Sequence, residues 1–142
     1  MRLRPVVVLF AFWMLACANL DREQGVSLPN QLDEISRGYI RDKGLLQEGE
    51  TVRAYYDVTV SLDGSEIALI TDRRVVYHKD GVTTDLPLAD IQDVSRTQEA
   101  LSDNFLITGR GGQMLQVSIA PMNGGDTWAQ VLDGARQGAA TP

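Results

Sequence analysis

The side chains best suited to catalysis in this sequence are a single histidine, His78, and a single cysteine, Cys17. In a catalytic triad, the imidazole base activates a hydroxyl or thiol nucleophile beside it. No serine stands in a Gly-x-Ser-x-Gly nucleophile elbow, and Cys17 lies in the apolar N-terminal region, so no catalytic triad is indicated. His78 ends an apolar run and precedes Lys79, which predicts a surface position. We therefore expect a protein that is not an enzyme.

Paired carboxylates are a second possible source of chemistry, but most aspartates here adjoin turns. In turns, an aspartate side chain accepts hydrogen bonds from nearby backbone amides, which is a structural role. The spacing of these aspartates lacks the dense alternating oxygen ligands that a calcium loop needs. A cysteine-rich zinc site is excluded because the chain has one His and one Cys. We expect no metal and no other cofactor. The aspartates considered are Asp57, Asp63, Asp72, Asp80, Asp85, Asp90 and Asp93.

Arginines could form a pocket for an anion. Arg73 and Arg74, together with Arg96 or Arg110, are the candidates, and the alternative is that these arginines are separate and solvated. Residues 109–112, Gly-Arg-Gly-Gly, would cradle a phosphate if a helix followed them. A strand pattern follows instead, which predicts a hairpin turn. The candidates for an anion pocket are Arg73, Arg74 and Arg110.

Length and charge limit the classes of function. The chain has 142 residues, 44% of them apolar, with 13 Lys and Arg against 19 Asp and Glu. This suits one domain with a real core, and excludes a disordered chain or a protein with several membrane spans. The net charge of −6 comes with no basic cluster, which argues against nucleic-acid binding.

The N-terminus is typical of a secretion signal. Arg2 and Arg4 precede an apolar run over residues 6–16, whose 11 residues would span only about 16 Å as a helix. Residues 14–17, Met-Leu-Ala-Cys, resemble a bacterial lipobox, in which the cysteine becomes the lipidated first residue. The first position of a lipobox is usually Leu, and Met14 departs from this pattern. A second possibility is cleavage after Ala18 by ordinary signal peptidase, which would discard Cys17. A third is that the segment is retained as a membrane anchor.

Cleavage before Cys17 would leave a strongly acidic protein on a lipid anchor. Removal of residues 1–16 leaves 11 basic and 19 acidic side chains, a net charge of −8. This charge opposes attraction to anionic headgroups, so acyl chains should provide the membrane attachment. Ala18 favours the outer membrane if the sorting rule of enteric bacteria applies. We expect a bacterial cell-envelope protein, and the alternative is a soluble periplasmic one.

Periodicity divides the remaining chain. Residues 17–26 are predicted to be a tether and residues 27–48 a helical segment, with a helix over 30–43 that presents Leu32, Ile35 and Tyr39 on one face. Residues 49–136 form the main domain, and residues 137–142 a loose tail. The apolar helix face needs a partner, which is either the outside of its own domain, another copy or another envelope protein.

The main domain is predicted to be an antiparallel sheet system closed by a helix. The clearest strand alternates over residues 51–62, and Asp63-Gly64 is a hairpin turn. Further strands are expected over 66–71, 74–78, 82–86, 92–98, 104–108 and 115–119, with a single turn at 88–91. Asp126 should cap the last helix, whose buried stripe is Trp128, Val131, Leu132 and Ala135.

About seven strands followed by one amphipathic helix is the order of elements in the pleckstrin-homology-like (PH-like) barrel. Residues 69–77, Leu-Ile-Thr-Asp-Arg-Arg-Val-Val-Tyr, resemble a strand–turn–strand segment of bacterial PH-like domains, and residues 86–91, Leu-Pro-Leu-Ala-Asp-Ile, are similar to the element that follows it. The resemblance covers residues 49–134. It implies a mainly β fold with helices, a capped barrel, and a scaffold that binds lipid headgroups, peptides or proteins without catalytic residues.

One departure from the family bears on lipid recognition. Phosphoinositide-binding members place basic residues around the first hairpin, whereas residues 61–66 here contain two acids and no base. We therefore expect a non-enzymatic envelope lipoprotein whose PH-like domain binds a protein or peptide at the membrane surface. The alternative is a carrier for a small ligand or lipid, held in the barrel or under the N-terminal helix.

Overall fold

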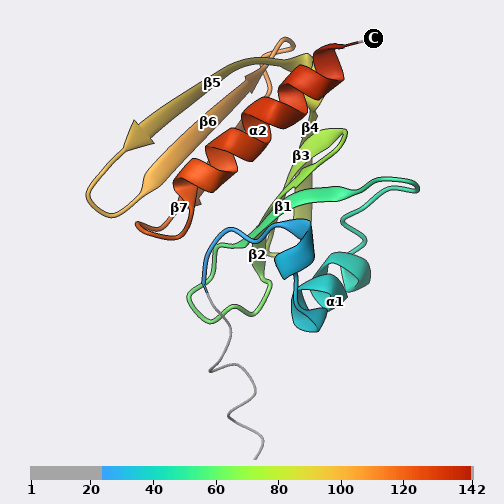
Figure 1. Cartoon of the computed structure of the whole chain (residues 1–142), viewed down its shortest axis with the longest axis vertical. Helices are drawn as coiled ribbons and strands as arrows, with labels where there is room; N and C mark the ends of the chain where they lie inside the picture. The colour runs from blue at the N-terminus through green and yellow to red at the C-terminus, as the bar shows by residue number, and fades with distance from the viewer. Residues whose placement is uncertain (1–23, 142) are drawn as a thin grey trace, which may run out of the picture.

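The structure, a computed structural model, describes residues 24–141 and is mainly β with two α-helices (Figure 1). The predicted signal segment, Cys17 and most of the predicted tether lie outside the described residues. Within residues 24–141, no helix has the length and apolar character required to cross a bilayer.

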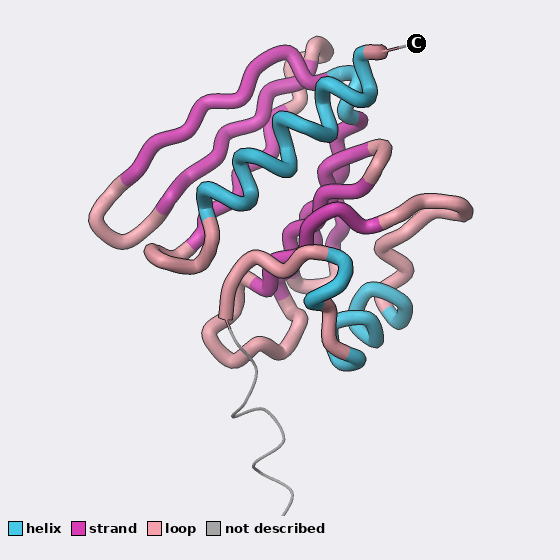
Figure 2. The backbone as a smooth tube through the Cα atoms, in the orientation of Figure 1, coloured by secondary structure: helices cyan, strands magenta, loops and turns pink. Residues whose placement is uncertain are grey.

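Seven strands form two antiparallel sheets, which lie at an angle to each other (Figure 2). The first sheet has the order β1-β2-β3-β4 and the second the order β5-β6-β7. A 3₁₀ turn, η2 (Leu88–Asp90), connects them, as predicted. The strands are β1 (Val52–Asp57), β2 (Glu66–Thr71), β3 (Arg74–Lys79), β4 (Val82–Pro87), β5 (Ile91–Gln98), β6 (Asp103–Gly109) and β7 (Met114–Ile119).

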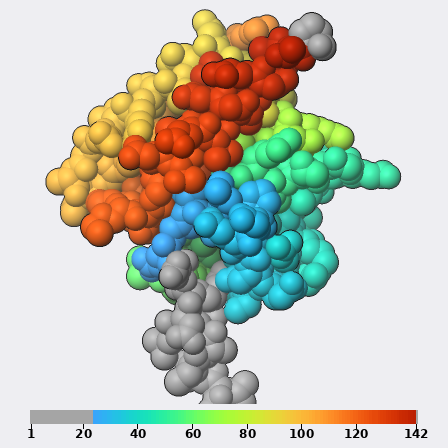
Figure 3. Space-filling view, in the orientation of Figure 1, coloured from blue at the N-terminus to red at the C-terminus, as the bar shows by residue number. Residues whose placement is uncertain are grey.

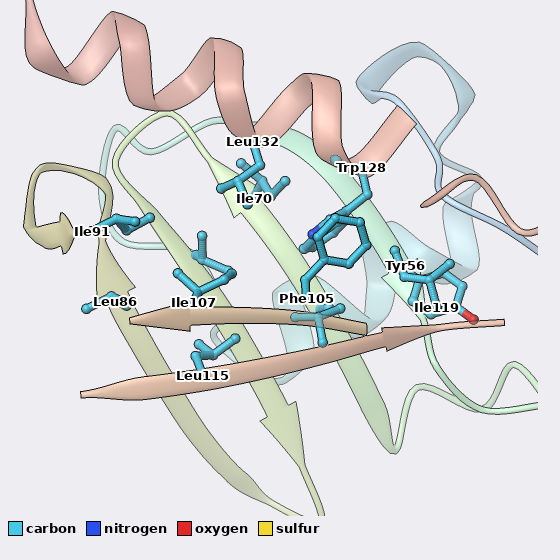
Figure 4. Packing of buried hydrophobic residues seen from close by; sticks show 14 of the residues in the cluster. Tyr56, Ile70, Leu86, Ile91, Phe105, Ile107, Leu115, Ile119, Trp128 and Leu132 are labelled. Atoms are coloured by element: carbon cyan, nitrogen blue, oxygen red, sulfur yellow. The ribbon is translucent and has the colours of Figure 1, made fainter. Parts of the chain in front are cut away.

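The expected closed barrel is not formed. β4 contacts β7, but no ladder of strand pairing joins the two sheets within the described residues. The main core fills the space between the sheets, and the terminal helix α2 (Gly125–Ala140) covers its open side (Figure 4). Trp128 and Leu132 of α2 are buried there, and Val131 and Ala135 pack against the same cluster, which confirms the predicted stripe.

The ends of α2 differ from the prediction. Its N-cap is Gly124, which has a φ of 91°, and not Asp126. A left-handed φ costs a glycine little, because it has no Cβ. The helix also continues to Ala140, so the loose tail expected from Gln137 is helical over four of its residues.

A second, smaller core lies on the opposite face of the first sheet. Helix α1 (Glu34–Asp42) packs there on its own domain, one of the three partners predicted for it. It begins at Glu34 because the carboxylate of Asp33 caps it, accepting a hydrogen bond of 2.6 Å from the N–H of Ser36. Two of the three residues predicted for the packed face, Leu32 and Tyr39, pack against this core. The third, Ile35, is 37% exposed, and Ile40 is buried in its place. A separate 3₁₀ turn, η1 (Pro29–Gln31), precedes α1.

β1 is half the predicted length because Asp57 ends it. The Asp57 carboxylate accepts hydrogen bonds from the N–H and hydroxyl of Thr59 and from the N–H of Gly64. These bonds hold residues 58–65 as a compact loop, which contains the predicted Asp63-Gly64 turn. The predicted tether is also shorter, because Val26 packs against the main core and its N–H donates to the Asn123 carbonyl at 2.8 Å.

Candidate functional site

The three candidate anion-pocket arginines do not assemble into one pocket. Arg74 is buried and forms two bonds with Glu50, at 2.8 Å (Nε to Oε1) and 3.0 Å (Nη2 to Oε2). Arg73 donates to the backbone carbonyls of Glu48 and Gly49. Arg110 is exposed on the β6–β7 turn and lines a shallow depression of about 550 Å³ with Arg136 of α2.

The Arg74–Glu50 pair is a closed structural element. Burial alone would raise the pKa of Glu50, but hydrogen bonds from Arg74, from the N–H of Gln47 and from the Thr71 hydroxyl outweigh it and lower the pKa to about 2. Asp85 lies 3.4 Å from Arg74 on its other side. Because carboxylates already compensate the guanidinium, it has no capacity to attract a further anion.

His78 is buried, at 6% exposure, so the predicted surface position is wrong. Along β3, Val76 and His78 point to the same face of the sheet, the face covered by α1. Its Nδ1 lies 2.8 Å from the Thr83 hydroxyl. Burial, and then the positive charge of Lys43, lower the pKa of His78, so the ring is neutral at neutral pH. Within residues 24–141 no three His, Cys, Asp or Glu side chains are grouped to hold a metal.

The edges of the two sheets differ in how they are covered. β1 forms a bridge with Ser27 and contacts α2, and β4 and β7 contact each other. β5 is the longest strand, and among the described elements only β6 makes extensive contact with it. Every second residue of an antiparallel edge strand points its N–H and C=O away from its partner. The outer edge of β5 therefore presents a row of backbone donors and acceptors, which another strand can pair with.

Side chains on the inner face of β5 fix this edge relative to α2. Ile91 is buried and Val94 packs against the main core. Arg96 binds Asp103 of β6 through two bonds, of 2.8 and 2.5 Å, and Asp126 of α2 through one of 2.7 Å. The guanidinium also lies 5.2 Å from the centre of the Phe105 ring. Hydrogen bonds from Arg96 lower the pKa of Asp103, in spite of its burial, so this carboxylate stays charged.

A cleft of about 470 Å³ lies between the C-terminal half of β5 and the first turn of α2. Its charged side chains are Arg96, Glu99, Asp103 and Asp126, which together carry a net negative charge. Arg96 is bound to two of the three carboxylates. A basic side chain entering the cleft would meet Glu99 and the exposed carboxylate of Asp126.

We name the outer edge of β5 together with this cleft the β5 edge site. Its geometry suits an extended peptide, which would pair with β5 through its backbone and place a basic side chain in the cleft. The sequence carried one signal for this site. Residues 92–98 alternate but contain only one large apolar residue, Val94, which is typical of a strand with little buried surface. Nothing in that pattern distinguishes a free edge from a paired one.

Comparisons with known proteins assign no family. No protein-family model and no curated protein matches the chain. Among solved structures, the chain is similar to the crystal structure of the C-terminal domain of an unknown protein from Leishmania infantum, with 10% sequence identity and a TM-score of 0.43. The likeness covers 71% of this chain and 94% of that domain. A likeness of this size indicates neither a shared fold nor a shared function.

Proposed function

We propose that this protein is a non-enzymatic, lipid-anchored binding module of the bacterial cell envelope. In this proposal its PH-like domain adds an extended segment of a partner protein to the free edge of β5. The order of elements, four strands and three strands followed by one helix, supports the PH-like arrangement. The lipobox-like residues 14–17 support acylation of Cys17.

The observation that carries the proposed binding activity is the outer edge of β5, with which no strand of residues 24–141 pairs. Strand addition draws its affinity from backbone hydrogen bonds and its specificity from pockets for side chains. The β5 edge site offers both, since the cleft beside Arg96 and Asp126 adjoins the strand. The acidic character of the cleft selects a partner segment that carries Lys or Arg.

A selection experiment tests this proposal. A phage-displayed random peptide library would be panned against residues 17–142 with the substitution Cys17→Ser. We expect enriched peptides to be rich in basic residues and to bind less tightly as salt concentration rises. Selection of acidic or purely apolar peptides would contradict the proposed chemistry of the cleft.

Two proline variants then test where the selected peptide binds. Thr97 and Gln98 are adjacent and exposed on β5, so one N–H points to β6 and the other to the free edge. Proline removes the N–H in Thr97→Pro and in Gln98→Pro. The variant that loses the outward N–H should stay folded and bind about tenfold more weakly, and the other should mainly lose stability. Unchanged peptide affinity in both folded variants would exclude the β5 edge.

A groove beside α1 favours a second candidate function, that of a lipid carrier. This groove of about 450 Å³ has mainly apolar walls, which include Leu32, Ile40 and Val52, and it carries Arg37 and Arg41. Such a lining suits a single-chain amphiphile with an anionic head. Native mass spectrometry with added palmitate tests it. The carrier function predicts a palmitate adduct that weakens in Arg37→Gln/Arg41→Gln, and no adduct with the parent protein would contradict it.

A further inference from the structure

The first described residues are held between two loops at one end of the molecule. The Gln24 side-chain amide donates to the Val60 carbonyl at 2.9 Å, in the loop between β1 and β2. Two residues later, the N–H of Val26 donates to the carbonyl of Asn123, in the turn between β7 and α2. In Figure 3 the first described residues, in blue, lie against the orange of that turn. These loops therefore surround the point where the described chain begins.

Each of these loops exposes a large apolar side chain at its tip. Val60 is 87% exposed and Met122 is fully exposed. Met122 also has a φ of 67°, a left-handed conformation that is costly for a residue with a Cβ. Leu101, which is 86% exposed, occupies the β5–β6 turn, whose residues line the cleft together with Met122. Exposure of apolar area to water is unfavourable, so apolar tips on three neighbouring loops indicate an apolar partner.

The length of chain before Gln24 identifies that partner. Seven residue steps separate Cys17 from Gln24, and an extended chain of this length reaches at most about 25 Å. An acylated Cys17 would therefore keep these loops close to the bilayer. We propose that Val60, Leu101 and Met122 form a membrane-contact surface that inserts into the bilayer interface; this inference rests on the proposed acylation of Cys17.

Charge on the three loops determines which lipid surface they suit. Residues 58–65, 99–102 and 120–124 contain no Lys or Arg, whereas Asp63 and Glu99 are exposed on them. Anionic headgroups would repel these carboxylates. The membrane-contact surface is thus suited to electrically neutral lipids such as phosphatidylcholine, and anionic lipid should reduce its insertion.

Spin labelling of the acylated protein in vesicles tests the inference. The mature protein has one cysteine, which acylation blocks, so Val60→Cys, Leu101→Cys and Met122→Cys each provide one labelling site. Met114→Cys is the matched control, since Met114 is 67% exposed at the opposite end of the second sheet. For each label in phosphatidylcholine vesicles, the measured quantity is the ratio of its accessibility to oxygen over its accessibility to a water-soluble nickel complex. This ratio should be several-fold higher at the three tips than at Met114. Added phosphatidylglycerol should reduce this ratio at the tips.

Mass spectrometry of the same samples distinguishes a failure of the proposed acylation from a failure of the proposed membrane-contact surface. An intact mass without acyl chains would overturn the anchoring proposal itself. An acylated protein whose four labels are equally exposed to water would overturn the membrane-contact surface and leave the anchor standing. Circular dichroism of each labelled variant verifies that it is folded.

Discussion

Arg96 and Asp126 join the edge strand β5 to the terminal helix α2 through a bond of 2.7 Å between Nη2 and Oδ1. The same guanidinium holds Asp103 of β6 through two bonds. One side chain thus fixes the second sheet, its free edge and the start of α2 relative to one another. The cleft of the β5 edge site takes its shape from this arrangement.

The two carboxylates on Arg96 should differ in their effect on stability. Asp103→Asn breaks a bidentate, largely buried pair and should lower the free energy of unfolding by about 1–3 kcal/mol. Asp126→Asn removes an exposed partner and should cost about 0.2–1 kcal/mol, because exposed ion pairs contribute little. Urea denaturation of both variants measures this, and an equal cost would show that Arg96 does not favour Asp103.

The buried pair of Arg74 and Glu50 should make the fold sensitive to acid. The pKa of Glu50 is lowered to about 2, so its contribution to stability is complete above the unfolded pKa of about 4.5 and is lost as pH falls through the folded value. Glu50→Gln should cost about 3–5 kcal/mol at pH 7, because it leaves Arg74 buried with only the partly exposed Asp85 as a countercharge. Denaturation curves from pH 6 to pH 2 should show a smaller decline for Glu50→Gln than for the parent protein.

A double variant is the control for this pair. Glu50→Leu with Arg74→Met removes both charges, so it should be more stable than either single variant, because no buried charge is left uncompensated. If the double variant is as unstable as the sum of the two singles, the two residues act independently and the proposed coupling is wrong.

His78 should produce a separate loss of stability in weak acid. Its pKa in the folded protein is lowered, so the unfolded chain binds the proton more readily. Stability should therefore be complete above the unfolded pKa of about 6.5 and fall as pH drops from there toward the folded pKa. Comparing denaturation midpoints at pH 7.5 and pH 5.5 measures the effect. His78→Gln should remove most of this difference. If the midpoint of the variant falls as much as that of the parent protein, a group other than His78 causes the pH dependence.

Two glycines with similar backbones test the contact between the β1–β2 loop and α1. Gly64 and Gly81 have φ values of 71° and 81°, but a Cβ on Gly64 would lie 2.6 Å from the Tyr39 ring, whereas one on Gly81 would meet nothing within 4 Å. Both alanine variants should lose about 1 kcal/mol or more from backbone strain. Gly64→Ala should lose additional stability through the contact with Tyr39. The difference in thermal unfolding midpoint between the two alanine variants measures this packing effect.

Local pattern predicted the elements that have both apolar periodicity and clear turn residues. The strands over 66–71, 74–78 and 82–86 and the stripe on the last helix agree with β2, β3, β4 and α2. Between β3 and β4, Asp80 and Gly81 both have a positive φ, as a tight Asp-Gly hairpin turn requires. In these segments the hydrophobic period and the turn chemistry specify the same structure, so no distant contact is needed to decide between alternatives.

Other features depend on contacts between distant segments. His78 is buried because α1 covers its face of the sheet, and the sequence around it carries no sign of that covering. Beyond Asp57 the alternating pattern continues, but the Asp57 side chain ends the strand by binding the loop. Closure of the sheets and the free edge of β5 depend on how the two sheets meet, which no local spacing encodes.

The central claim is that a partner peptide pairs with the outer edge of β5, and nuclear magnetic resonance tests it most directly. A selected peptide bound to the isotope-labelled protein would be examined for intermolecular contacts between backbone protons. We predict a ladder of contacts from the peptide to residues 93–98, with slower exchange of the outward-facing amides of that strand. A bound peptide whose contacts fall on β4, β7 or α1, and not on β5, would contradict the proposed function.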